Sequence, residues 1–481
     1  MKISRKLRLG KSQYELDFVD VDPNRDTPLF VDPYFLAQRY DSWSIRAART
    51  IRNFFEYFIT LLRSGKRELA RELFNQLGEP NETCLGLSRG RPQGRGIGKV
   101  NADDIFKSLL KSKAVLTGVI EDIEDCRIFV EGIDKDKISD MATNVIRGHL
   151  IEYTQQQCRL WGIPLTQNVP SGFLWQPDTR QWESGYTEML VIGERKSLLV
   201  PKAIVSYSDK YTPQRYHRHF VLNFLQHEHL RMNSALVQRR KRRDGSERVW
   251  VTKKSIIEHE ARLTKEYLTQ FTRSHPDIFR DFRSTTIQTD SLLNEELTSE
   301  DLDTIVDQLI TELRAILPGP EHATRYHRVI AGILELIFYP RLICPQIERE
   351  IHNGRKRIDI TFDNAAKEGF FWRLHTTLKI PAQFIIVECK NYKRDVANPE
   401  LDQIAGRFSL NRGKFGLVVC RDIDDFGAFI KRCTDTYKDD RGVILPLIDR
   451  DIIGILEKVK ERNQRPDEEL LSDRFRDVVF Q

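Results

Sequence analysis

The most restrictive feature of this sequence is a buried-strand pattern that ends in two charged residues. Residues 383–389 read Gln-Phe-Ile-Ile-Val-Glu-Cys, and Lys390 follows directly. A continuous apolar run of this kind is typical of a central strand that is covered on both faces of its sheet. Residues i and i+2 of a strand share one face and lie about 6.5–7 Å apart. Glu388 and Lys390 are therefore expected side by side at the end of a buried strand, where two charged groups need a functional reason.

The residues on either side of this run predict a mixed α/β domain over residues 321–462. Helical and alternating apolar patterns place its elements in this order: a helix over 321–338, strands over 342–351, 357–363 and 383–389, a helix from 398, a strand over 414–420, a helix over 426–437, a strand over 443–447 and a helix over 452–459. The order indicates a mixed sheet flanked by helices, an α+β arrangement within the α/β class. Residues 463–481 are expected to form a polar tail.

The larger part of the chain precedes this domain and carries weaker signals. Residues 1–290 are expected to form a mostly helical, mixed α/β region that serves recognition or regulation, with a subdomain break near 165–172. A polar linker and a bridging helix are expected over 291–320. A chain of 481 residues has room for two or three such domains.

The composition narrows the class of protein. The longest apolar runs are interrupted by Glu or Thr and are too short for a bilayer, so no membrane span and no membrane partner are expected. The seven cysteines include no CxxC pair, which argues against a disulfide framework or a four-cysteine zinc site and favours the reducing cytoplasm. The net charge of +6 is too small by itself to indicate a polyanionic partner.

Acidic residues on two of the expected strands suggest a metal site. Asp359 lies in an alternating strand, and Glu388 ends the buried one. With the carbonyl of Cys389, these carboxylates would give oxygen ligands to Mg²⁺ or Mn²⁺. Such an ion polarises a scissile phosphate and lowers the pKa of a bound water. Lys390 would orient that water or stabilise the developing negative charge.

The order of these elements and residues resembles the PD-(D/E)xK, or restriction-endonuclease-like, superfamily. The resemblance covers about residues 321–459, implies an αβββαβ core, and rests on Asp359 followed by Glu388-Cys389-Lys390. It implies that Glu335, in the opening helix, is an additional acid near the metal. It also implies a site role for Gln403, which matches the glutamine of the branch with methylation-dependent restriction nucleases and archaeal junction resolvases. The long segment 364–381 departs from the pattern and is interpreted as an insertion beside the site.

The resemblance implies a metal-dependent endonuclease, with DNA favoured over RNA because most members cut DNA. Beside a large N-terminal region, such a domain suggests a restriction or anti-phage defence enzyme that works as a homodimer or with a defence-system partner protein. Two alternatives stay open. One is a non-catalytic nucleic-acid-binding or scaffold protein that keeps the nuclease fold, and the other is a repair or recombination nuclease that acts on structured DNA.

A second candidate site is the basic run over residues 238–254. Arginine is dense in this run, which includes Arg239, Arg240, Arg242 and Arg243, and Trp250 follows. The arginines are suited to contact a phosphate backbone, and the indole is suited to stack on a base. The alternative is a solvated basic hairpin around Asp244-Gly245 with no ligand.

Overall fold

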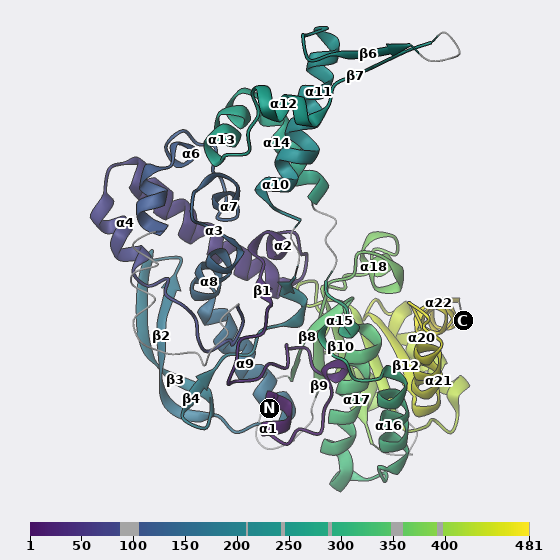
Figure 1. Cartoon of the computed structure of the whole chain (residues 1–481). Coiled ribbons are helices and arrows are strands. Elements are labelled where there is room, and N and C mark those ends of the chain that lie inside the picture. Colours follow the sequence, from purple (N-terminus) through teal and green to yellow (C-terminus); the bar gives the residue numbers. More distant parts are fainter. Residues whose placement is uncertain are drawn as a thin grey trace.

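The structure, a computed structural model, describes residues 1–86, 105–207, 210–241, 246–286, 291–347, 359–391 and 398–480. Within these ranges the chain is a mixed α/β protein with many helices and several small sheets, which confirms the expected class (Figure 1). No described helix has the length and apolar character that crossing a membrane requires.

The C-terminal part is built on a five-stranded sheet with the strand order β12-β11-β10-β9-β8. Its strands are β8 (Leu342–Ile347), β9 (Asp359–Asn364), β10 (Phe384–Lys390), β11 (Phe415–Cys420) and β12 (Val443–Ile448). The strands β10, β11 and β12 run parallel, whereas β9 is antiparallel to both β8 and β10. All residues of β11 and β12 are buried, as expected for apolar strands covered on both faces.

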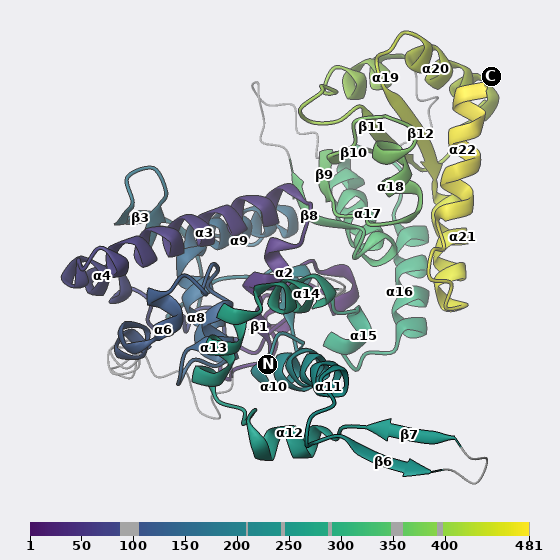
Figure 2. The same ribbon diagram turned by 90° about the horizontal axis from the view of Figure 1, so that it is seen from above.

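Helices surround this sheet in the order that the sequence predicts, with two additions described below. They are α16 (Leu302–Ala315), η4 (Pro320–His322), α17 (Ala323–Phe338), α18 (Gly369–Thr376), α19 (Asn398–Ala405), α20 (Phe426–Lys438), α21 (Asp449–Lys460) and α22 (Glu468–Phe480). Helix α17 contacts β8 and β10, and α16 and α21 pack beside it. Helices α20 and α22 contact each other and β12 (Figure 2).

Two helices lie in segments for which the sequence pattern predicts no helix or strand. The presumed insertion contains α18, and the presumed polar tail contains α22. Leu471 and Val478 of α22 are fully buried, and the Val478 carbonyl accepts a hydrogen bond from Thr434 of α20 at 2.9 Å. The Glu468 carboxylate accepts the Phe370 N–H of α18 at 2.8 Å. Residues 468–480 thus belong to the C-terminal fold, because a few apolar positions among many charges are enough to dock this helix.

The N-terminal part contains the remaining elements. Its helices are α1 (Ile3–Lys6), η1 (Gln13–Glu15), α2 (Pro33–Ala37), α3 (Ser42–Arg63), α4 (Arg67–Phe74), α6 (Lys113–Leu116), α7 (Asp125–Phe129), α8 (Lys135–Val145), α9 (Arg147–Trp161), η2 (Lys202–Ile204), α10 (Pro213–Tyr216), the π-helical turn η3 (His217–Val221), α11 (Leu222–Arg231), α12 (Lys253–His259), α13 (Lys265–Ser274), α14 (Pro276–Thr286) and α15 (Asn294–Leu297). Its strands are β1 (Phe30–Val31), β2 (Thr166–Gln176), β3 (Gln181–Ile192), β4 (Arg195–Ser197), β5 (Val205–Ser206), β6 (Gln238–Lys241) and β7 (Glu247–Trp250).

The suggested break near 165–172 falls inside a packed unit. Strand β2 begins at Thr166, pairs with β3, and contacts α9 and α8. Trp175 of β2 packs edge-on against Phe54 of α3 at a centroid distance of 5.0 Å and donates to Asn53 at 3.0 Å. The structure therefore differs from the suggested subdivision, because β2 shares its core with helices that precede it in the chain.

The N-terminal part is also bound tightly to the edge of the C-terminal sheet. Asp17 accepts the backbone N–H of Cys344 in β8 at 3.1 Å, and Gln157 of α9 donates to the Pro345 carbonyl at 3.1 Å. One continuous apolar core includes residues of both parts. The strand β9 is held as well, since the Asp363 carboxylate accepts the Trp43 N–H at the first turn of α3 at 2.9 Å.

Candidate functional site

The end of β10 brings together an acid and two cations. Glu388 and Lys390 are almost completely buried and lie side by side, as strand geometry predicts. The Lys390 ammonium donates to Oε1 of Glu388, and Nη1 of Arg407 donates to Oε2 of the same carboxylate at 3.1 Å. Both oxygens of the buried carboxylate therefore have a cationic partner.

The register of the sheet places residue 359 beside this group. The backbone of Asp359 in β9 is directly opposite Glu388 of β10 in the antiparallel ladder. Directly opposite residues occupy the same face of a sheet, with Cβ atoms about 4.5–5.5 Å apart. Positions 359, 388 and 390 thus share one face. The side chain of Asp359 lies outside what the structure describes.

Cys389 can contribute only its backbone to such a site. Burial raises the pKa of its thiol well above the ordinary range, with Glu388 adding to the effect. The thiol is therefore protonated at neutral pH, which makes it a poor ligand for a hard cation. The carbonyl, which the sequence analysis predicts as a ligand, lies beside His327 of α17.

His327 and Asn391 are site neighbours that sequence reasoning missed. Burial lowers the pKa of His327 to about 4, against the opposing effects of the Cys389 backbone and of Glu388. Its Nδ1 is buried without a hydrogen-bond partner. Asn391, the residue after Lys390, donates to the carbonyls of Leu317 and Gly319 at 3.0 and 2.9 Å, which fixes the turn before α17 against the end of β10. The sequence held no signal for either contact, because both join segments distant along the chain.

Arg407 was missed for a different reason. It follows α19 by two residues and its backbone N–H bonds to Ile404, so it extends the turn that the helix begins. Gln403, half-buried on α19, lies four residues earlier and so on the same side of this helical turn. The predicted glutamine thus does lie on the helix that leads to the site. No motif in the sequence distinguishes Arg407 from the many other arginines of the chain.

Glu335 has a different environment from the predicted one. Its carboxylate pairs with the fully buried Lys202 of the N-terminal part at 3.1 Å. Burial raises the pKa of Glu335 to about 8, and Lys202 opposes this shift. Eight residues separate Glu335 from His327, which corresponds to about 12 Å along a helix. The contacts of Glu335 are therefore at the junction with the N-terminal part, and it is His327 of α17 that lies beside Cys389.

The donor set can be compared with the needs of a divalent ion. Mg²⁺ binds oxygen ligands and usually takes one or two carboxylates with water and phosphate. The described residues form no cluster of three or more His, Cys, Asp or Glu side chains suited to a metal. Glu388 with the Cys389 carbonyl offers two oxygen donors, and the register adds position 359. This set fits Mg²⁺ or Mn²⁺ if Asp359 contributes its carboxylate.

The basic run forms a hairpin elsewhere in the molecule. Strands β6 and β7 pair so that Gln238 is opposite Trp250. Arg239 and Arg240 lie on β6, whereas Arg242 and Arg243 lie outside the described residues. The hairpin is far from the C-terminal sheet in both Figure 1 and Figure 2, so the two predicted sites are not brought together.

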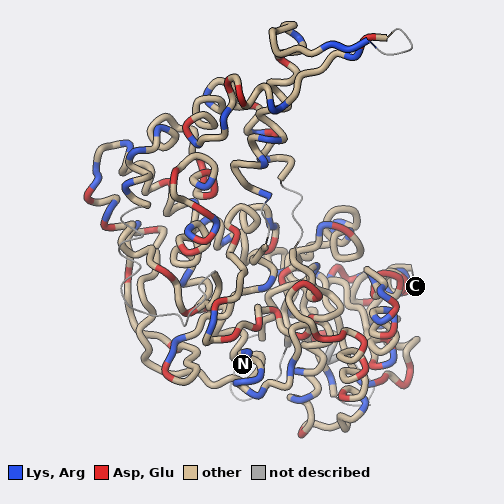
Figure 3. Tube along the Cα trace, in the orientation of Figure 1, with Lys and Arg blue, Asp and Glu red and all other residues tan. Residues whose placement is uncertain are grey.

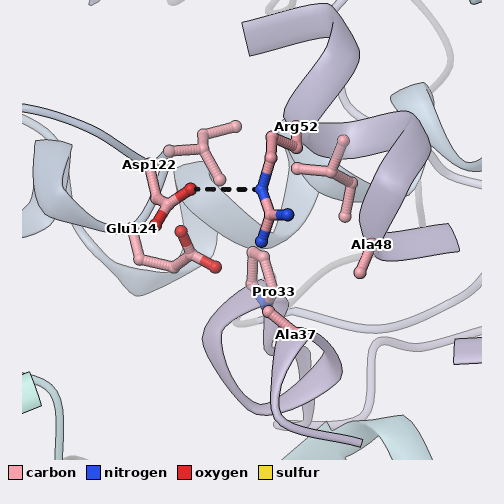
Figure 4. Close-up of a pocket in the computed structure, with 8 residues that line it drawn as sticks. Pro33, Ala37, Ala48, Arg52, Asp122 and Glu124 are labelled. Atoms are coloured by element: carbon pink, nitrogen blue, oxygen red, sulfur yellow. Dashed lines mark ion pairs between the residues drawn. The ribbon is translucent and has the colours of Figure 1, made fainter. Parts of the chain in front are cut away.

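A small pocket in the N-terminal part does not offer a ligand site. It is lined by Pro33, Ala37, Ala48, Ile51, Arg52, Asp122, Ile123 and Glu124 (Figure 4). Its volume of about 10 Å³ is room for roughly one water molecule. The Arg52 guanidinium and the Asp122 carboxylate meet there at 3.9 Å, and burial raises the pKa of Glu124 well above its ordinary value. The pocket lies between α2, α3 and the segment before α7.

Comparison with known proteins bears on the N-terminal part. Residues 8–212 match the model of a domain of unknown function, DUF8370. No curated protein and no solved structure matches the chain. The matched region contains Asp17, Trp43 and Lys202, which contact the C-terminal part, and it ends before the β6–β7 hairpin.

Proposed function

We propose that the C-terminal part is a metal-dependent nuclease that hydrolyses phosphodiester bonds of DNA, with Mg²⁺ or Mn²⁺ as its cofactor. One observation carries the proposal: Asp359, Glu388 and Lys390 occupy one face of adjoining strands, and Glu388 is a buried carboxylate. The order of elements from α17 to β11 supports this proposal, with α18 as an added helix in the segment interpreted as an insertion. Perturbed or buried charges gathered in one place are frequent at functional sites.

Each residue has a chemical task in this proposal. Glu388, the Cys389 carbonyl and Asp359 would hold the ion, which when bound supplies Lewis-acid activation of the phosphate and of a water. Lys390, already hydrogen-bonded to Glu388, carries a compact positive charge suited to orient the attacking water or to stabilise the phosphorane-like transition state. Arg407 would exchange its bond to Glu388 for one to the phosphate, since a guanidinium is well suited to bind phosphate oxygens.

The biological setting follows from the resemblance alone. We propose an endonuclease of restriction or anti-phage defence in the cytoplasm, with the N-terminal part in recognition or regulation. A nuclease of repair or recombination would use the same residues on branched DNA. A non-catalytic binding protein would keep the fold and lose the chemistry.

One experiment separates these three hypotheses. The pure full-length chain is incubated with linear, supercoiled and branched DNA and with RNA, each in Mg²⁺, Mn²⁺, Ca²⁺ or EDTA. The proposal predicts cleavage of DNA in Mg²⁺ or Mn²⁺, little in Ca²⁺ and none in EDTA. Preference for branched DNA would indicate the repair class. Full activity in EDTA, or no cleavage under any condition, would contradict the proposal.

A further inference from the structure

The β6–β7 hairpin stands apart from the rest of the molecule. We refer to residues 238–241 and 247–250 as the arm. In two views at right angles the arm extends away from the body of the chain (Figures 1 and 2). All four residues of β6 are exposed, and a separate small core of Leu222, Val251, Ile256 and Ala261 holds the base. The arm is thus a two-stranded ribbon mounted on a local support.

The two faces of the arm differ in charge. Gln238 pairs with Trp250, and Arg240 pairs with Arg248. Since opposite residues share a face and faces alternate along a strand, these four side chains form one face. The Arg248 guanidinium lies over the Trp250 ring at 5.4 Å from its centroid. Among the described residues this face contains no acid.

The other face carries an acid that offsets part of its positive charge. Arg239 pairs with Glu247 at 3.6 Å, and it also donates to the Asn233 side chain. Lys241 is directly opposite Glu247, and Val249 is directly opposite Arg239. Opposite charges across a ladder stabilise a hairpin. This face therefore has the charge pattern of a hairpin that is stable in water without a partner.

The face that carries Trp250 has like charges in place of an ion pair. Arg240 and Arg248 are exposed like charges at directly opposite positions, an arrangement that destabilises a two-stranded ribbon. A polyanion on this face would turn that repulsion into attraction. Two-stranded ribbons fit the major groove of B-form DNA, whereas the major groove of duplex RNA is too deep and narrow for side chains to read.

We propose that the arm binds duplex DNA through the face formed by Arg240, Arg248 and Trp250, at a place remote from the cleavage site. The choice of DNA as ligand rests on the proposed function. More cations lie near the base of the arm. Burial lowers the pKa of His219 there, and the nearby charges of Lys253, Arg215 and Arg218 lower it further. Figure 3 shows Lys and Arg positions along the arm and on the chain at its base.

The test measures binding without cleavage. Anisotropy of labelled duplex DNA, single-stranded DNA and duplex RNA is followed with the full-length chain in EDTA over a series of KCl concentrations. For Arg240→Gln/Arg248→Gln, the slope of log affinity against log salt for duplex DNA should fall by about 1.8, because each lost phosphate contact removes about 0.9. The control Lys241→Gln removes a cation from the opposite face and should leave the slope nearly unchanged.

Several results would contradict DNA binding by the arm. An unchanged slope in the double variant, an equal effect in the control, or a loss confined to single-stranded DNA or duplex RNA would overturn it. The inference would also be overturned if light scattering showed a changed oligomeric state of the double variant while its binding to duplex DNA stayed intact. A wild-type chain that binds duplex through this face and cuts nothing would support the arm and contradict the nuclease. If the wild-type chain cuts DNA but the double variant has the wild-type salt slope, the result supports the nuclease and contradicts DNA binding by the arm.

Discussion

The backbone of Asp359 in β9 lies directly opposite Glu388 in β10, on the face that also carries Lys390. Two acids and a lysine on one face of adjoining strands are the minimum that a carboxylate-held ion and a water-orienting ammonium require. Around them, Arg407 comes from the turn that follows α19, and His327 comes from α17.

Arg407→Gln should tighten the binding of a divalent ion. Nη1 of Arg407 donates to Oε2 of Glu388 at 3.1 Å, so an incoming ion meets a carboxylate whose charge is already shared with two cations. Removal of one cation raises the affinity of the carboxylate for Mn²⁺. Titration of Mn²⁺ by electron paramagnetic resonance measures this. An affinity equal to or weaker than that of the wild type would contradict the assignment.

Lys390→Met should separate ion binding from chemistry. The methionine is an unbranched side chain one atom shorter than lysine and has no charge to orient water or stabilise a transition state. We expect the rate of DNA cleavage at saturating substrate to fall by about a hundredfold or more, and Mn²⁺ binding to be retained. Loss of metal binding with loss of cleavage would show that Lys390 acts on the site in another way.

Asp363→Asn should flatten the dependence of stability on pH. Burial raises the pKa of Asp363 to about 7, with Asp41 adding to the effect and the Trp43 N–H opposing it. The folded state therefore retains a proton that the unfolded state loses near pH 4, so stability falls between about pH 4 and 7, by at most about 1.4 kcal/mol per unit. Asparagine keeps an acceptor for Trp43 and has no such titration.

Unfolding by urea at several pH values compares the Asp363→Asn chain with the wild type. The variant should be relatively more stable at pH 7 than at pH 5. Asp363→Ala, which lacks the acceptor, should be less stable than Asp363→Asn at both. Parallel pH profiles for wild type and Asp363→Asn would mean that Asp363 does not carry the proton.

Lys202→Met should weaken the junction between the two parts of the chain. Lys202 pairs with Glu335 at 3.1 Å, donates to Asn294 at 2.8 Å and lies over the Tyr339 ring at 4.0 Å. Removal of one partner from a buried ion pair costs about 3–5 kcal/mol, whereas an apolar replacement of both is much milder. The free energy of unfolding should therefore be higher for Lys202→Met/Glu335→Leu than for Lys202→Met. If the free-energy costs of Lys202→Met and Glu335→Leu simply added up in the double variant, the result would contradict a pair between Lys202 and Glu335.

The local patterns of the C-terminal part were predictable because they are short-range. The apolar run before Glu388 gave β10 within one residue, and Asn398-Pro399 marked the start of α19. The placement of Glu388 beside Lys390 also follows from strand geometry alone. Helix α22 escaped prediction because its two fully buried apolar residues, Leu471 and Val478, are spread among charges.

What remained hidden depends on contacts between distant segments. The helical period of α17 marks both Glu335 and His327 as inward-facing, but it does not tell which turn faces β10 and which faces Lys202. The bonds of Asp17 to Cys344 and of Asp363 to Trp43 span more than three hundred residues. The two faces of the arm required the strand register, since the composition of the run counts all its arginines alike.

The most direct test of the proposed active site is the rate of DNA cleavage in Mg²⁺ for Glu388→Gln and Asp359→Asn, each compared with Glu457→Gln. Glu457 is an exposed carboxylate on α21 in the same part of the chain, so it controls for the change of charge. We predict that both site variants keep the wild-type circular dichroism and lose cleavage by at least about a hundredfold, while Glu457→Gln cleaves at the wild-type rate. Cleavage by Glu388→Gln at the wild-type rate would contradict the assignment.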